Sequence, residues 1–120
     1  MSNDRNVVQD KSYMFALRIV KLHGWLRKNK QEYVLAKQLL RAGTSIGANV
    51  EEAIGAHSDR DFLSKMTIAY KEARETRYWL RLLNDSDLLD GHGDAILQDV
   101  EELLRLLGAI TRTMRAKIHQ

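Results

Sequence analysis

The chain has 120 residues, a formal net charge of +3 and 44% hydrophobic residues, and it contains neither proline nor cysteine. This length is typical of one domain, residues 1–120. The lack of cysteine excludes disulfides, thiolate metal sites and cysteine nucleophiles. No apolar stretch approaches the ~20 residues that span a bilayer, and residues 1–6 lack the apolar run of a secretory signal. We therefore expect no membrane partner and a cytoplasmic location, and the mild basicity makes nucleic acid a candidate partner.

Apolar residues recur at alternating steps of three and four in four segments, and no segment alternates every two residues as a strand does. The predicted helices cover roughly residues 8–28, 31–56, 59–84 and 94–118. Because the links between them are short, the expected fold is all-α, an antiparallel up-down-up-down four-helix bundle.

The first predicted helix, 8–28, has two apolar sides. Its core stripe is Phe15, Ile19, Leu22 and Leu26. The second side lies nearly opposite and comprises Tyr13, Leu17 and Val20. A helix that is apolar on two sides must bury both, so we expect the second side to contact another copy of the chain.

The same helix carries the candidate nucleic-acid-binding site, a basic stripe of Lys11, Arg18, Lys21, Trp25 and Lys28. Cations bind a phosphate backbone, and an exposed indole stacks on a base. The alternative is an ordinary solvated face that favours solubility. A ring of subunits that repeats the stripe favours binding, because affinity rises steeply with the number of phosphate contacts.

The second predicted helix, 31–56, follows a tight link at Asn29, Lys30 and Gln31. Glycines at 43, 47 and 55 each cost about 1 kcal/mol against alanine inside a helix, and close packing is the expected reason for them. Beside the core stripe lies an apolar flank that we expect to face a neighbouring subunit: Ala36, Leu40, Gly43, Gly47, Val50 and Ile54.

The third predicted helix, 59–84, starts at a capping box in which Ser58 accepts a bond from the amide three residues on. Half-buried charges need partners, so its glutamates are expected to join the polar edge of the second helix and fix helix register. This predicted polar network comprises Arg41, Ser45, Asn49, Glu52, Glu72 and Glu75. The alternative is a ligand or nucleic-acid site. The predicted oligomer interface combines Tyr13, Leu17 and Val20 with Ile68, Trp79 and Leu82.

The fourth predicted helix, 94–118, is expected to be capped by Asp94. No catalytic residue, metal or cofactor is predicted, because no Glu-x-x-His or His-Glu-x-x-His motif occurs and the four histidines are scattered. One enzymatic alternative is an RNase, since some all-helical RNases pair an arginine with a histidine four to six residues later, as in Arg18 and His23. These two side chains point ~140° apart on a helix, which disfavours that interpretation.

Three segments resemble a bacterial family of four-helix bundles, named for proteins encoded in intervening sequences of large-subunit ribosomal RNA genes. The segments are residues 35–53 (LAKQLLRAGTSIGANVEEA), 65–80 (KMTIAYKEARETRYWL) and 15–22 (FALRIVKL). The resemblance implies an antiparallel bundle that assembles as a homopentamer and has no established enzymatic activity. A related branch serves as the accessory protein of diversity-generating retroelements, where a basic pentamer binds a reverse transcriptase and nucleic acid. No feature here supports transfer of the reverse-transcriptase partner.

The sequence therefore predicts a non-enzymatic homo-oligomer, a pentamer by resemblance, that binds RNA or DNA through its basic stripe. The alternative is a protein-interaction scaffold, in which the apolar flanks of the third and fourth helices recruit an unidentified protein through Trp79.

Overall fold

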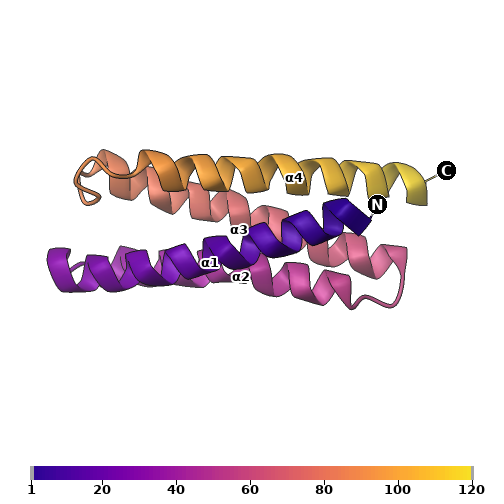
Figure 1. Cartoon of the computed structure of the whole chain (residues 1–120), viewed down its shortest axis with the longest axis horizontal. Helices are drawn as coiled ribbons and strands as arrows, with labels where there is room; N and C mark the ends of the chain where they lie inside the picture. Colours follow the sequence, from indigo (N-terminus) through magenta and orange to yellow (C-terminus); the bar gives the residue numbers. More distant parts are fainter. Residues whose placement is uncertain (1, 120) are drawn as a thin grey trace.

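A computed structural model describes residues 2–119 of the chain, and side chains from residue 5 onward. It contains four helices and, within residues 2–119, no strand: α1 (Ser2–Lys30), α2 (Val34–Ile54), α3 (Asp59–Asp85) and α4 (Asp94–Ile118). The helices alternate in direction along a bundle 50 Å long, so α1 begins and α4 ends at the same end (Figure 1). The predicted all-α four-helix architecture is confirmed.

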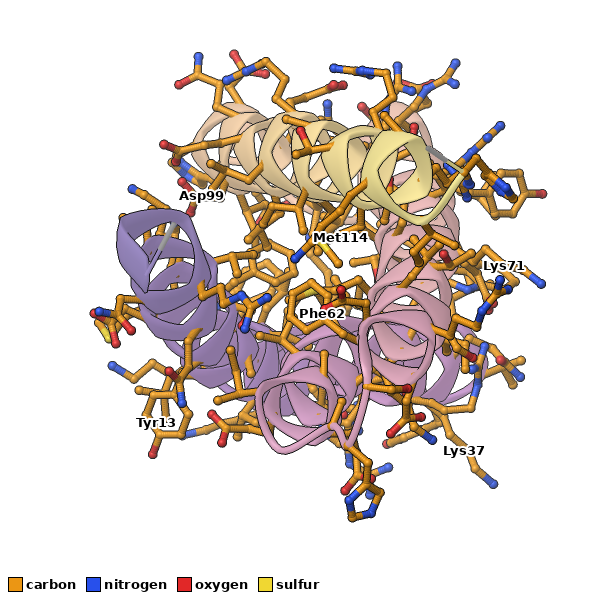
Figure 2. All side chains as sticks on the ribbon, turned by 90° about the vertical axis from the view of Figure 1, so that its right-hand side faces the viewer. Tyr13, Lys37, Phe62, Lys71, Asp99 and Met114 are labelled. Atoms are coloured by element: carbon orange, nitrogen blue, oxygen red, sulfur yellow. The ribbon has the colours of Figure 1, made fainter. Side chains whose placement is uncertain are left out.

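Viewed along the bundle axis, the four helices form the corners of a square in which α1 lies diagonally opposite α3 (Figure 2). The core is built from the predicted stripes, because steps of three and four keep these side chains on the inner face of each helix. In α3 and α4 the residues that recur at these steps are all buried: Phe62, Met66, Ala69, Ala73, Thr76, Leu80, Leu83, Ile96, Val100, Leu103, Leu107, Ile110 and Met114.

The apolar flank of α2 corrects one expectation, since half of it packs inside the bundle. Ala36, Gly43 and Val50 are buried, so they are not surfaces for another subunit. A Cβ atom at Gly43 would lie 2.8 Å from two carbons of the Ile19 side chain, and one at Gly47 would lie 3.3 Å from the Ser12 carbonyl oxygen. The predicted close packing at these two glycines is confirmed, and α1 is the element that comes close.

Of the two helix N-caps predicted from the sequence, one is confirmed and one is wrong. Ser58 Oγ accepts a hydrogen bond from the Asp61 amide at 3.1 Å, as predicted. The expected Asp94 cap is wrong, because Gly93 occupies the N-cap position and supplies no side chain. Gly55 lies just after the last residue of α2 rather than inside the helix.

The link between α1 and α2 lies later in the chain than predicted, at residues 31–33. The first helix continues through Lys30, and the chain turns at Gln31, which has a φ of 52°. Glu32 then caps α2, because its Oε1 accepts hydrogen bonds from the amides of Leu35 and Ala36. No helix within residues 2–119 combines the length and apolar character needed to cross a membrane.

Candidate nucleic-acid interface

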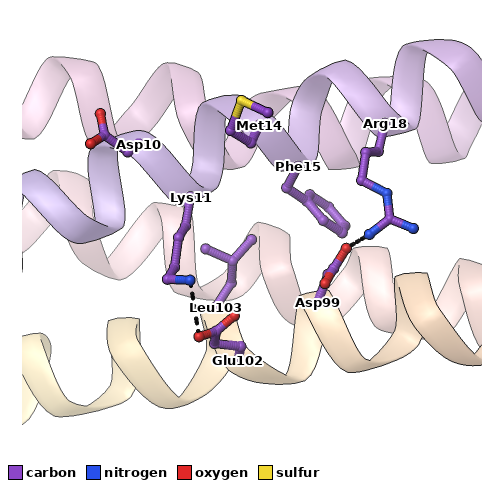
Figure 3. A pocket seen from close by; sticks show the side chains of 8 residues that line it. All are labelled: Asp10, Lys11, Met14, Phe15, Arg18, Asp99, Glu102 and Leu103. Atoms are coloured by element: carbon purple, nitrogen blue, oxygen red, sulfur yellow. Dashed lines mark ion pairs between the residues drawn. The ribbon is translucent and has the colours of Figure 1, made fainter.

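Two cations of the predicted basic stripe are paired with carboxylates of α4. We call the surface where α1 and α4 face each other the α1–α4 seam. A cavity of ≈ 310 Å³ lies in it, between Phe15 of α1 and Leu103 of α4. Across this cavity Lys11 Nζ lies 3.2 Å from Glu102 Oε2, and Arg18 forms an ion pair with Asp99 (Figure 3). The bundle itself therefore neutralises half of the four predicted cations.

Of the remaining residues of the stripe, only Trp25 lines a cavity within residues 5–119 together with one of these two, Arg18. Lys21 and Lys28 are exposed, and neither has an ion-pair partner among residues 5–119. Trp25 is half-buried and packs against the core. Its indole lines a separate cavity of ≈ 420 Å³, which is bordered on the other side by Leu89 and Ile96. The predicted stacking residue is thus largely engaged within the bundle.

The predicted polar network is formed by only some of its members. Arg41 Nη1 of α2 lies 3.4 Å from Glu72 Oε1 of α3, and Arg41 also forms an ion pair with Glu75. Glu75 Oε2 in turn accepts a hydrogen bond from the indole nitrogen of Trp79 at 2.9 Å. This cluster ties α2 to α3 and includes Trp79, which the sequence assigned to the oligomer interface.

The other members of that predicted network lie apart from the cluster. The side-chain amide of Asn49 donates to the carbonyl oxygen of Ser45 at 2.9 Å, a contact within one helix turn. Glu52 is exposed and has no ion-pair partner among the described side chains. No hydrogen bond joins either Asn49 or Glu52 to α3 in the described part of the chain.

The predicted oligomer interface is largely exposed on the single chain. Tyr13 is 62% exposed, Val20 is 51% exposed, and Leu17 and Ile68 are 41% and 39% exposed. Trp79 and Leu82 are half-buried. Tyr13 projects from the bundle on the side opposite Lys71 of α3 (Figure 2). The apolar face of α1 is therefore the uncovered part of the predicted interface.

The residues of the RNase alternative have separate surroundings. The guanidinium of Arg18 is bound by Asp99, and no hydrogen bond joins it to His23 among the described side chains. His23 itself is half-buried. Within the same part of the chain, no group of three His, Asp or Glu side chains is placed to hold a metal ion.

A second cationic surface lies between α3 and α4, and sequence reasoning missed it as a site. This α3–α4 groove has a volume of ≈ 570 Å³. It is lined by Tyr70, Arg74, Arg77, Glu101, Leu104, Arg105, Gly108 and Arg112. The two helices are adjacent sides of the bundle (Figure 2), so the outer edges of both contribute side chains.

Charge pairing leaves most of the groove's arginines available. Arg77 Nε lies 2.7 Å from Glu101 Oε2, the one acidic side chain of the lining. Arg74, Arg105 and Arg112 are exposed, and none has a carboxylate within 4.0 Å among residues 5–119. The groove therefore offers a concentrated positive charge to a ligand.

A signal for this groove was present in the sequence. Tyr70, Arg74 and Arg77 follow one another at steps of four and three, so they lie along one edge of α3. Arg105 and Arg112 are seven residues apart, about two turns, and share an edge of α4. The two glutamates that bind Arg41 lie on the other edge of α3.

The fold and these surfaces define the chain as a four-helix-bundle protein with a cationic groove on one edge. The chain belongs to the 23S rRNA-intervening sequence protein family, whose sequence model matches residues 4–109. The resemblance noted for residues 35–53 and 65–80 is thereby confirmed.

A solved structure agrees with this membership. The chain is similar to a protein with unknown function from the S23 ribosomal protein family of Bacteroides thetaiotaomicron, with 46% sequence identity and a TM-score of 0.88. The match covers 91% of this chain and 98% of that one. No curated protein matches the chain.

Proposed function

We propose that this protein is a homo-oligomeric nucleic-acid-binding protein that acts by binding rather than by catalysis. The observation that carries the proposal is the group of unpaired arginines, Arg74, Arg105 and Arg112, which line a single groove. Arginine binds phosphate through a planar fork of donors and is always charged, so three such groups in one groove suit a phosphate backbone.

The basic stripe of α1 has a smaller role in this proposal. Lys21 and Lys28 remain free to contact phosphate, while the charges of Lys11 and Arg18 are offset by acids of α4. Each cation that releases a counterion adds to affinity, so the two free lysines extend binding beyond the groove.

Assembly through α1 is the second part of the proposal. Tyr13, Leu17 and Val20 form an exposed apolar face, and beside Tyr13 lies a shallow cavity of ≈ 260 Å³ that is floored by small residues of α2. A second copy that covers this face removes apolar surface from water. Because α1 lies diagonally opposite α3 (Figure 2), α1-mediated contacts leave the α3–α4 groove open. The family resemblance implies five subunits.

Light scattering tests both parts. The protein alone should have the mass of an oligomer near five subunits, and a short structured RNA should add to that mass at low salt and dissociate at high salt. An oligomer that never gains RNA contradicts nucleic-acid binding. A monomer contradicts assembly, and Tyr13→Ser with Leu17→Ser should produce that monomer without loss of helix content.

A protein-interaction scaffold is the second candidate function. Ile68 and Tyr78 are exposed apolar residues on α3. The ring of Tyr78 lies edge-on to the half-buried ring of Trp79, and the two ring centroids are 5.0 Å apart. This function predicts a partner protein whose capture survives nuclease treatment and is lost on Trp79→Ala. The control Tyr13→Ser should retain that partner.

A further inference from the structure

The α3–α4 groove contains a feature that phosphate binding alone does not require, an aromatic ring beside a missing side chain. Tyr70 packs in part against the core and also lines the groove. A Cβ atom at Gly108 would lie 3.6 Å from Tyr70 Cε1, and 3.9 Å from both Tyr70 Oη and Arg112 Nη1. The absent side chain at Gly108 thus leaves a notch between a phenol ring and a guanidinium.

The surroundings of this notch combine the two contacts that a nucleotide needs. Arg105 and Arg112 carry positive charge on the α4 side, and Arg74 carries it on the α3 side. Aromatic rings and guanidinium planes both stack on bases, and such stacking accepts any base because every base has a π-face. A base in a duplex is already stacked and paired, so it reaches such a notch only if it is unpaired.

We infer that the α3–α4 groove is a binding site for single-stranded nucleic acid, in which an unpaired base stacks on Tyr70 over Gly108 while the three free arginines bind the adjacent phosphates. This inference rests on the proposed function and specifies its ligand. A site for phosphate alone would bind the duplex at least as tightly as the single strand, because the duplex has the higher charge density. A site for free nucleotides would bind a mononucleotide as tightly as an oligonucleotide.

The test measures fluorescence anisotropy of a labelled, unstructured RNA of about 20 nucleotides, of the matching duplex, and of a labelled mononucleotide, at about 100 mM salt. The intact protein should bind the single strand about 10-fold more tightly than the duplex, and the mononucleotide far more weakly than either. Tyr70→Leu should weaken single-strand binding about 10-fold and leave duplex binding unchanged, whereas Tyr70→Phe should retain both.

A second pair of variants tests the notch without changing Tyr70, whose ring packs in part against the core. Gly108→Leu fills the notch from α4 without removing any core side chain and should weaken single-strand binding about as much as Tyr70→Leu. Gly108→Ala fits at ordinary contact distances, so it should bind like the intact protein. Circular dichroism establishes that each variant is folded.

The outcomes separate this inference from the proposal on which it rests. Absence of binding to any RNA overturns the proposed function itself. Equal binding of single strand and duplex, with no effect of Gly108→Leu, overturns the single-strand site and leaves nucleic-acid binding intact. A mononucleotide that binds as tightly as the oligonucleotide assigns the notch to free nucleotides and also overturns the inference.

Discussion

The two edges of α4 carry opposite charges, and each faces a row of cations on a neighbouring helix. Toward α1 the helix presents Asp99 and Glu102, which neutralise Arg18 and Lys11. Toward α3 it presents Arg105 and Arg112 with a single acid, Glu101, so net positive charge accumulates in the α3–α4 groove. Cations therefore form ion pairs across the α1–α4 seam, whereas most of the cations in the groove are free to bind a ligand.

Exposure does not distinguish the two regions. The side chains of Lys11 and Arg18 are each 45% exposed, and the unpaired arginines of the groove, Arg74, Arg105 and Arg112, are exposed as well. What differs is the number of acids across from each row of cations. Pairing between helices, rather than solvent access, therefore decides which cations are available to phosphate.

The largest expected effect comes from reversing the charge of the groove. Arg74→Glu, Arg105→Glu and Arg112→Glu together should lower RNA affinity at least ~100-fold at low salt, because three phosphate contacts are lost and three repulsions are added. Anisotropy measures the affinity, and thermal unfolding should show little change in stability.

The matched control reverses three exposed cations outside the groove and the basic stripe, Arg27, Lys37 and Arg60, with the same change in net charge. It should weaken RNA binding much less than the groove variant does. Equal losses for the two triple variants would mean that total charge, and not the groove, governs binding.

The next effect separates the two sides of α1. Its seam with α4 contains a cavity, whereas its packing on α2 leaves no room at Gly43. Gly43→Ala should lower the free energy of unfolding by about 1 kcal/mol, because overpacking against Ile19 outweighs the gain in helix propensity.

Gly24→Ala is the matched substitution within α1, where nothing lies within 4 Å of the added carbon. It should raise the free energy of unfolding by up to about 1 kcal/mol. Denaturant unfolding measures both variants, and a shift of the same sign in the two would show that α2 does not determine the position of α1.

An effect of similar size is expected from reversing the charges of the α1–α4 seam. Lys11→Glu with Arg18→Glu places like charges opposite Glu102 and Asp99 and should lower stability by about 1 kcal/mol, since exposed ion pairs contribute little. The melting temperature should fall by about 4 °C. Adding Asp99→Lys and Glu102→Lys should restore it, and failure of this charge swap would show that the ion pairs do not bridge α1 and α4.

The smallest expected effect comes from removing the two negative charges of the α1–α4 seam, which makes its cations comparable with those of the groove. Asp99→Asn with Glu102→Gln releases Lys11 and Arg18 while preserving side-chain shape. RNA affinity should then rise about threefold, and its dependence on salt should steepen by about one or two released counterions. Unchanged affinity and slope would indicate that the seam cations contact no phosphate even when they are free.

The periodicity of single helices accounts for most of what the sequence predicted correctly. Steps of three and four correctly predicted the buried faces of α3 and α4. Ser58 correctly predicted the start of α3, because N-capping depends on neighbouring residues only. Gly43 and Gly47 indicated a close approach, but the sequence assigned it to another subunit. Periodicity gives the angle of a residue on its own helix and leaves open which helix it faces.

The candidate site was predicted less well for the same reason. Lys11 and Arg18 share a side of α1 in any projection, and their pairing with α4 depends on the relative height of two helices that are distant in the sequence. Tyr70, Arg105 and Gly108 come together only when α3 and α4 are adjacent and antiparallel. The edge of α3 that carries Arg74 and Arg77 was visible, but its complement on α4 was not.

The alternating direction of the four helices also has a consequence for engineering. Because α1 begins at the end of the bundle where α4 finishes (Figure 1), a short linker can join the start of α1 to the end of α4. New termini can then be opened at the turn around Gln31, which produces a circular permutant with α2 first and α1 last. Permutation is tolerated at exposed turns near the surface, so the permutant should retain every core stripe and the groove.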